Sequence, residues 1–172
     1  MKSAKKTSSR KDDHIKMCIE RDVSSGKTNG FEMYEFEHNA LPETRLSDVN
    51  TSTEFLGRIF KLPLFIEAMT GGSPGTEKIN RNLAIAAEKM GIGMGVGSQR
   101  AMLENPELKY TYDVRDVAPN IFLLGNIGAA QLTVYSANEI RGVVKDIGAD
   151  GIAVHLNAAQ ELAQPEGDSD WS

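Results

Sequence analysis

Four polar side chains follow an apolar stretch late in the sequence, and together they could bind an anion and a metal ion. The stretch Gly151–Val154 leads directly into His155, Asn157, Gln160 and Glu161. In a strand His155 and Asn157 share one face, and the other two residues come just beyond the strand end. A single carboxylate among neutral groups suits Mg²⁺, which keeps several waters and is commonly held by one or two carboxylates plus phosphate oxygens. Zn²⁺ fits less well, because His155 and Glu161 have no third strong ligand nearby.

Polar groups end three earlier apolar stretches in the same way. "AMTGG" places Thr70 beside two glycines, "GMGVGSQR" ends in Ser98 and Arg100, and Asn126 lies within "LLGNIG". The Arg100 guanidinium is a fork suited to phosphate, and an amide within a buried strand needs partners that a ligand could supply. Alternating glycines weaken a strand unless another group approaches its backbone. Each motif alone is also compatible with a structural role.

Four apolar stretches, alternating with helical patterns, must position these groups. They begin near residues 64, 92, 121 and 151, 28 to 30 residues apart, which is typical of βαβ units and a parallel sheet. Ser73 and Pro74 predict the start of a helix, and the capping box of Ser136 and Glu139 predicts another. The stretch 98–104 is expected to be a loop, with a helix opening at residue 105.

Polar residues after every strand favour a TIM (β/α)₈ barrel over an open doubly wound sheet, because barrel ligands are bound by the ends of many strands around one mouth. Such a barrel takes roughly 250 residues, whereas this chain has 172 residues and four βα units. We therefore expect a disordered basic tail over 1–9, an N-terminal helix and irregular extension over 10–62, and the first half of a barrel over 63–172. Because no closing element follows the last unit, the sequence is interpreted as truncated.

Composition excludes several classes of protein. The formal net charge of -5 argues against a surface built for nucleic acid, although the first eleven residues are locally basic. No stretch approaches the roughly 18 apolar residues of a membrane span, and no signal-peptide pattern follows the basic start, so we expect a cytoplasmic protein without a membrane partner. Cys18 is the only cysteine, which excludes an internal disulfide.

Five motifs together resemble one enzyme family. They are "RKDDH" (10–14), "AMTGG" (68–72), "GVGSQR" (95–100), "GNIGAAQ" (125–131) and "HLNAAQE" (155–161). In this order and spacing they closely resemble the type 2 isopentenyl-diphosphate isomerases, over nearly the whole chain and the N-terminal half of that family's FMN-binding barrel. The resemblance implies interconversion of isopentenyl and dimethylallyl diphosphates in isoprenoid biosynthesis, with reduced FMN, Mg²⁺ and commonly NADPH as reductant. It also implies that the full-length form is a homo-oligomer.

The resemblance further implies roles for individual residues. The flavin contacts would be Ala68, Met69, Thr70, Ser98 and Asn126. The substrate contacts, mostly to the diphosphate, would be Arg10, Lys11, Ser98, Gln99, Arg100, His155, Asn157 and Gln160. Gln160 would also be the catalytic residue, implicated in proton transfer, and Glu161 would be the Mg²⁺ ligand. Because an amide is a poor acid or base, Gln160 is interpreted as an orienting or relay group, with the flavin as the principal proton carrier.

Two other interpretations stay open. The chain would be part of another FMN-dependent barrel oxidoreductase if a hydride-accepting arrangement followed later, or a noncatalytic half-barrel that binds a partner or self-associates through its open sheet edge. The later strands that supply the family's flavin phosphate site have no counterpart in this sequence. We therefore expect the chain alone to bind FMN weakly and to be inactive.

Overall fold

The computed structural model describes the backbone of residues 2–163 and 167, and the side chains of these residues except 2–10 and Gln160. The helices are α1 (Lys2–Glu20), α2 (Pro74–Met90), α3 (Arg100–Glu104), α4 (Ala137–Asp146) and α5 (Ala158–Ala163). The strands are β1 (Thr53–Phe55), β2 (Arg58–Phe60), β3 (Phe65–Ile66), β4 (Gly93–Gly95), β5 (Leu123–Gly128) and β6 (Gly151–His155). Short 3₁₀ helices occupy Phe31–Met33, Leu46–Asp48, Pro106–Thr111 and Ala129–Thr133.

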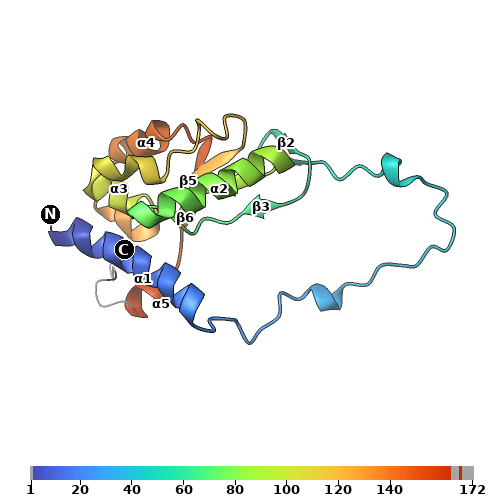
Figure 1. The fold of residues 1–172 in the computed structure, drawn as a ribbon, viewed down its shortest axis with the longest axis horizontal. Coiled ribbons are helices and arrows are strands. Elements are labelled where there is room, and N and C mark those ends of the chain that lie inside the picture. The colour runs from blue at the N-terminus through green and yellow to red at the C-terminus, as the bar shows by residue number, and fades with distance from the viewer. Residues whose placement is uncertain (1, 164–166, 168–172) are drawn as a thin grey trace.

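Strands β3 to β6 form one parallel sheet in chain order (Figure 1). Phe65 lies opposite Gly93, Met94 opposite Leu123, and Leu124 opposite Gly151. This order is that of successive units in an α/β barrel, whereas an open doubly wound sheet reverses its order where it binds a ligand. The four strands are therefore compatible with part of an α/β barrel, and a closed TIM barrel stays a prediction.

Local sequence signals account for the two long helices beside this sheet. Ser73 occupies the N-cap of α2 with Pro74 in the first turn, and Gly91 ends the helix with a left-handed φ of 67°. At α4, Ser136 Oγ accepts from the Glu139 N–H at 3.3 Å, and Glu139 Oε2 accepts from the Ser136 N–H at 2.8 Å. The predicted starts of both helices are confirmed.

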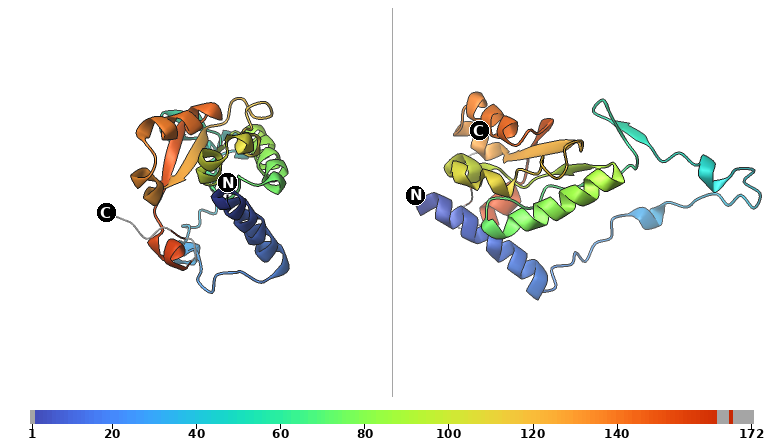
Figure 2. Two further views of the ribbon diagram at one scale, coloured as in Figure 1. Left: turned by 90° about the vertical axis from the view of Figure 1, so that its left-hand side faces the viewer. Right: turned by 45° about the horizontal axis from the view of Figure 1, so that its top comes forward.

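The hydrophobic core lies between the sheet and the helices that flank it (Figure 2). Its fully buried side chains include Met94 of β4, Leu123 and Ile127 of β5, and Ile147 after α4. Tyr112 is the largest fully buried side chain among the described residues. Burial is most complete in the central strands β4 and β5, whereas β3 is partly buried and β6 has no buried residue.

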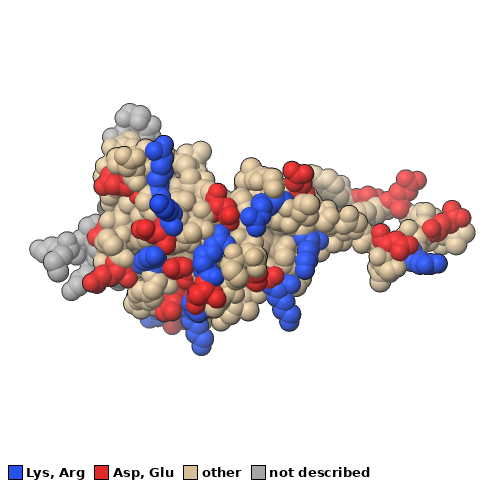
Figure 3. Space-filling view, turned by 90° about the horizontal axis from the view of Figure 1, so that it is seen from above, with Lys and Arg blue, Asp and Glu red and all other residues tan. Residues whose placement is uncertain are grey.

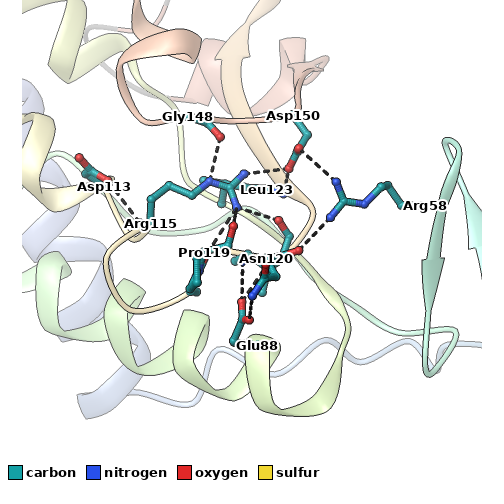
Figure 4. Close-up of polar contacts among 11 residues, drawn as sticks. Arg58, Glu88, Asp113, Arg115, Pro119, Asn120, Leu123, Gly148 and Asp150 are labelled. Atoms are coloured by element: carbon teal, nitrogen blue, oxygen red, sulfur yellow. Dashed lines mark hydrogen bonds and ion pairs between the residues drawn. The ribbon is translucent and has the colours of Figure 1, made fainter.

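A polar network ties the beginnings of β5 and β6 to α2 (Figure 4). Asp150 Oδ2 accepts from the Leu123 N–H and from Arg115 Nη2, both at 2.8 Å. Glu88 of α2 accepts from the Asn120 side-chain amide at 2.8 Å and from the Asn120 N–H at 3.0 Å. Since these contacts lie at the N-terminal ends of the strands, the network stabilises the end of the sheet opposite the candidate site.

The N-terminal part of the chain differs from the prediction. α1 begins at Lys2, so helix replaces the disordered tail expected over 1–9, and it ends at Glu20. Residues 21–52, which we call the extended segment, contain two 3₁₀ turns and no buried residue, and they form the long excursion on the right of Figure 1. Strands β1 and β2 form an antiparallel hairpin around Gly57, with Thr53 opposite Phe60.

One local prediction between β4 and β5 was wrong, because the stretch expected to be a loop contains α3. The helix expected to open at residue 105 does begin there, as a 3₁₀ helix whose start is capped by Asn105 Oδ1, at 3.2 Å from the Glu107 N–H. Asn105 itself is extended, which separates the two helical pieces. Within the part of the chain that the structure describes, no helix has the length and apolar character needed to cross a membrane.

Candidate functional site

The candidate site lies at the carboxyl ends of the parallel strands. Thr70 and Ser98 follow β3 and β4, Asn126 lies in the second half of β5, and His155 is the last residue of β6. Because the strands are parallel, these ends meet at the same edge of the sheet. Residues that are separated by about 30 positions in the sequence are therefore collected along one edge, as the sequence predicted.

Helix α1 brings a cation to this edge. Lys11 Nζ donates to the Ser98 carbonyl at 2.9 Å and to the Tyr112 hydroxyl at 3.2 Å. Two predicted substrate contacts, Lys11 and Ser98, are thus in contact although 87 positions separate them. The side chain of Arg10, which was predicted beside them, lies outside the described residues.

Arg100 stands at the start of α3, next to Ser98. Its backbone N–H donates to Ser98 Oγ at 3.4 Å, and its Nε donates to Glu104 Oε1 at 3.0 Å. The side chains of Arg100 and Glu104 are only 22% and 10% exposed, so this ion pair is largely shielded from water. A phosphate that binds Arg100 would share the guanidinium with Glu104.

Gln99 does not reach the surface, which differs from its predicted contact with substrate. Its side chain is fully buried; Nε2 donates to the Val143 carbonyl at 2.8 Å, and Oε1 accepts from the Asn126 N–H at 3.3 Å. A Cβ on Gly125 would lie 2.5 Å from Oε1, so this glycine makes room for the amide. Gln99 therefore joins β5 to α4 instead of facing a ligand.

Thr70 is held by a side chain that sequence reasoning missed. Its hydroxyl donates to Asn80 Oδ1, while Asn80 Nδ2 donates to the carbonyls of Thr70 at 3.1 Å and Thr111 at 2.8 Å. Asn80 is buried on α2, and a polar residue on the buried face of a helix was the available signal. Ala68 and Thr70 are half-buried beside it, and Met69 is exposed.

The glycines in and just after β4 make room for a neighbouring part of the chain. A Cβ on Gly93 would meet the Phe65 ring, one on Gly95 would meet Ala68, and one on Gly97 would lie 2.7 Å from the Thr70 carbonyl. The Gly97 N–H also donates to that carbonyl at 2.7 Å. The group that approaches the β4 backbone is thus the neighbouring strand β3 and the loop after it.

Asn126 offers an amide at the centre of the sheet edge. The residue is 7% exposed. Its carbonyl accepts from the Gln99 N–H at 2.8 Å, and its own N–H donates to Gln99 Oε1 at 3.3 Å. A buried side-chain amide needs hydrogen-bond partners, and a polar ring edge, such as that of a flavin, would supply them. The chemistry of Asn126 therefore fits the predicted flavin contact.

The predicted metal and substrate groups at β6 lie near the surface. His155 ends β6 and is exposed, while Asn157 and Glu161 are half-buried. The Glu161 N–H donates to the Asn157 carbonyl at 3.2 Å, which places both residues at the start of α5. The side chain of Gln160, the predicted catalytic residue, lies outside the described residues.

The donor set around Glu161 limits the metal that it could bind. Among the described residues no group of three His, Cys, Asp or Glu side chains could hold a metal ion. A metal bound through Glu161 would therefore need water and ligand oxygens to complete its coordination, which is an arrangement that Mg²⁺ commonly adopts.

An apolar cavity opens between α1 and the end of β3. Its volume is about 290 Å³. Four apolar side chains line it, two from α1 (Ile15 and Ile19) and two from the β3–α2 region (Met69 and Ile79), and Lys11 and His14 add polar groups. The cavity thus combines a hydrocarbon-like wall with a cation at the strand ends.

Comparison with known proteins gives one consistent result. The chain is 52% identical over 163 residues to a protein of Methanoregula boonei, 47% identical over 180 residues to one of Pyrococcus furiosus, and 47% identical over 163 residues to one of Rickettsia bellii. Each of these is named isopentenyl-diphosphate delta-isomerase. No protein-family model matches the chain.

The matched regions cover nearly all of this chain but less than half of each relative. They include 94% to 100% of this chain but only 45% to 48% of the three relatives. The chain thus spans about half the length of the curated relatives it matches, and over nearly all of its own length it is homologous to proteins named isopentenyl-diphosphate delta-isomerase.

Proposed function

We propose that this chain provides one half of a type 2 isopentenyl-diphosphate isomerase, which interconverts isopentenyl and dimethylallyl diphosphates with the help of FMN. The observation that carries the proposal is the 52% identity to the Methanoregula boonei isomerase over 94% of the chain. The five motifs at the strand ends agree with it. The activity is that of the whole enzyme, and the chain on its own is expected to be inactive.

The geometry of the strand ends supports a substrate with an anionic head and a hydrocarbon body. The Lys11 ammonium donates to the Ser98 carbonyl, and Arg100 follows two residues later, where its backbone N–H donates to Ser98 Oγ. A diphosphate carries several negative charges, and charge-assisted hydrogen bonds from two cations bind it more strongly than neutral donors do. The apolar cavity that begins at Lys11 is suited to the hydrocarbon part of the molecule.

Asn126, Ala68, Met69 and Thr70 are the residues that would hold FMN. Asn126 would donate or accept at the polar edge of the ring, and exposed Met69 would lie against its apolar face. Reduced FMN, regenerated with NADPH, would supply an electron-rich ring beside the reacting hydrocarbon. Because Asn80 fixes the Thr70 hydroxyl and carbonyl, the loop that meets the ring is held in place before the cofactor binds.

Glu161 would hold Mg²⁺ and thereby neutralise part of the diphosphate charge. One carboxylate, together with phosphate oxygens and waters, is a common Mg²⁺ environment. His155 and Asn157, on the preceding strand end, would donate hydrogen bonds to the same diphosphate. Gln160 would orient the substrate or relay a proton, since an amide is too weak an acid or base to act alone.

A chimeric enzyme tests this proposal directly. In it, this chain replaces the 45% of the Methanoregula boonei isomerase that it matches, and the remainder of that protein is kept. The chimera is expected to be yellow and to convert isopentenyl diphosphate to dimethylallyl diphosphate when reduced. A folded, FMN-loaded chimera without turnover, beside an active Methanoregula boonei enzyme, would contradict the proposal.

The Glu161→Gln chimera is expected to need much more Mg²⁺ at an unchanged FMN affinity. The substitution removes a full charge with little change of size, and the loss of a charge-assisted contact costs about 1.5 to 3 kcal/mol, or roughly ten- to a hundredfold in apparent metal affinity. The measurement is a Mg²⁺ titration of activity. Glu107→Gln, which removes an exposed carboxylate elsewhere, is the matched control, and equal Mg²⁺ midpoints in all three proteins would exclude Glu161 as the ligand.

A further inference from the structure

We propose that Tyr112 is a positioning residue, whose buried hydroxyl fixes the Lys11 ammonium at the end of β4 where an anionic ligand would meet it. The inference rests on the proposed function for the identity of the ligand, a diphosphate. The positioning itself rests on contacts within this chain. Neither the sequence motifs nor the predicted site includes Tyr112.

The Tyr112 hydroxyl joins α1 to the end of β4. It donates to the Ser98 carbonyl at 2.8 Å and accepts from Lys11 Nζ at 3.2 Å. Lys11 Nζ donates to the same carbonyl at 2.9 Å, so the three groups form a closed set of hydrogen bonds. The ammonium also lies 5.3 Å from the centre of the Tyr112 ring, within the range of a cation–π contact.

Packing holds the Tyr112 ring in one place. The side chain is fully buried, and a Cβ on Gly71 would overlap its ring. Gly71 and Gly72 have φ of 138° and 91°, a region that other residues rarely adopt, so this turn requires glycine for two independent reasons. The Gly72 N–H donates to Thr111 Oγ1 at 2.9 Å, which fixes the turn against the residue before Tyr112. A hydroxyl on so constrained a ring can act as a fixed reference point.

The chemistry of the partners suits a cation that must meet an anion. Burial raises the pKa of the Tyr112 phenol, and the nearby charge of Glu104 raises it further. The phenol therefore stays neutral at physiological pH. The phenol and the Ser98 carbonyl are both uncharged, so these two contacts orient the ammonium and do not themselves neutralise it.

Lys11 needs such a reference point because the chain after α1 gives it little support. α1 packs against α3, but the extended segment that follows it has no buried residue. A lysine side chain also loses considerable rotamer entropy when it is ordered. If Tyr112 orders it beforehand, a ligand does not bear that cost when it binds.

The first experiment measures the positioning without any ligand or activity. The 172-residue chain is treated briefly with an amine-acetylating reagent, and mass spectrometry compares the acetylation rates of Lys11 and of exposed Lys61. We expect Lys11 to react more slowly than Lys61 in the unmodified chain, and at least about threefold faster after Tyr112→Phe, since one hydrogen bond contributes a stabilisation of that order. Tyr110→Phe, which changes a half-exposed neighbour, is the matched control and should leave the ratio unchanged.

The second experiment separates positioning from a merely structural role. In the chimera, Tyr112→Phe is expected to raise the KM for isopentenyl diphosphate about tenfold, with little change in kcat or FMN affinity. Combined with Lys11→Met, it should add little to the effect of Lys11→Met alone, because both remove the same contact. Additive effects on KM would overturn the proposal.

The acetylation ratio and the activity of the chimera test the positioning of Lys11 and the proposed function independently. If the chimera binds FMN but turns over no substrate, the proposed function fails, whereas the acetylation ratio still decides the position of Lys11. If Lys11 reacts as fast as Lys61 in the unmodified chain, or if a normally melting Tyr112→Phe protein shows no change in the ratio, Tyr112 does not position Lys11.

Discussion

Strand β5 and the extended segment contain similar apolar side chains in opposite environments. Leu123 of β5 is 0% exposed, whereas Leu46 of the extended segment is 90% exposed. Further exposed apolar side chains of the same segment are Phe31, Met33, Tyr34, Phe36 and Leu41. An apolar side chain stabilises the fold only where another element removes it from water. β5 lies between β4 and β6, whereas no described element packs over the extended segment.

Charge separates the two regions as well. Acidic side chains gather at the far end of the extended segment, with a basic side chain among them (Figure 3). The segment contains the exposed residues Glu32, Glu35, Glu37 and Glu43. On the packed body, acidic and basic side chains are interspersed. Like charges close together oppose collapse of the segment onto itself, which agrees with its extended course.

Replacement of one leucine in each region tests the comparison with the largest expected effect. Leu123→Ala should lower the free energy of unfolding by about 2 to 5 kcal/mol, because it leaves a cavity in a packed core. Leu46→Ala, the same chemical change at an exposed position, should alter it by less than about 0.5 kcal/mol. Urea unfolding followed by circular dichroism measures both.

Similar changes in the free energy of unfolding for Leu123→Ala and Leu46→Ala would contradict the difference between the two regions. A large loss at Leu46 would mean that the extended segment packs against a surface in solution, such as another copy of the chain. A small loss at Leu123 would mean that β5 is not the centre of the stable core.

Sequence patterns predicted the packed body better than the site on it. The starts of α2 and α4 follow from Ser73, Pro74 and Ser136, because capping is decided by residues within one turn. The parallel sheet follows from the spacing of the apolar stretches. α3 was missed, since its five residues are too few for a helical period to be visible.

The orientations of individual site residues depend on distant partners. Gln99 points inward because Val143, 44 positions later, offers a carbonyl to its amide. Lys11 reaches Tyr112 across 101 positions. Nothing in the sequence distinguishes Gln99 or Tyr112 from other polar or aromatic residues. The glycines of the turn before α2 suggest that a ligand approaches the backbone, whereas the structure shows that they accommodate the Tyr112 ring.

Acid should lower the free energy of unfolding of the packed body in part through Glu88. This effect is expected to be smaller than that of Leu123→Ala. Burial alone would raise the pKa of Glu88, but hydrogen bonds from the Asn120 side chain and from the Asn120 and Ile121 N–H groups, with the charge of Arg115, hold it below the ordinary 4.5. The pKa is lower in the folded state, so the stabilisation is present above 4.5 and is lost as the pH falls through the folded value.

Glu88→Gln should therefore reduce the loss of unfolding free energy between about pH 6 and pH 3.5. One unit of pKa corresponds to about 1.4 kcal/mol, and because the carboxylate is only partly buried the change should be smaller than that. Glu54→Gln, at an exposed position of β1, is the control. An identical pH dependence in the Glu88→Gln and unmodified proteins would show that this contact does not contribute to acid unfolding.

The smallest effect on stability is expected from Phe36→Ser in the extended segment. Phe36 is fully exposed, so its removal should change the free energy of unfolding by less than about 0.5 kcal/mol. Its effect should appear in self-association, because exposed aromatic side chains close together favour contacts between copies of a chain. Sedimentation velocity at several concentrations of the 172-residue chain should show weaker association for Phe36→Ser than for the unmodified protein. Glu37→Ser, one position later, is the control and should not weaken association. If both variants sediment alike, the apolar side chain at this position does not mediate contacts between copies.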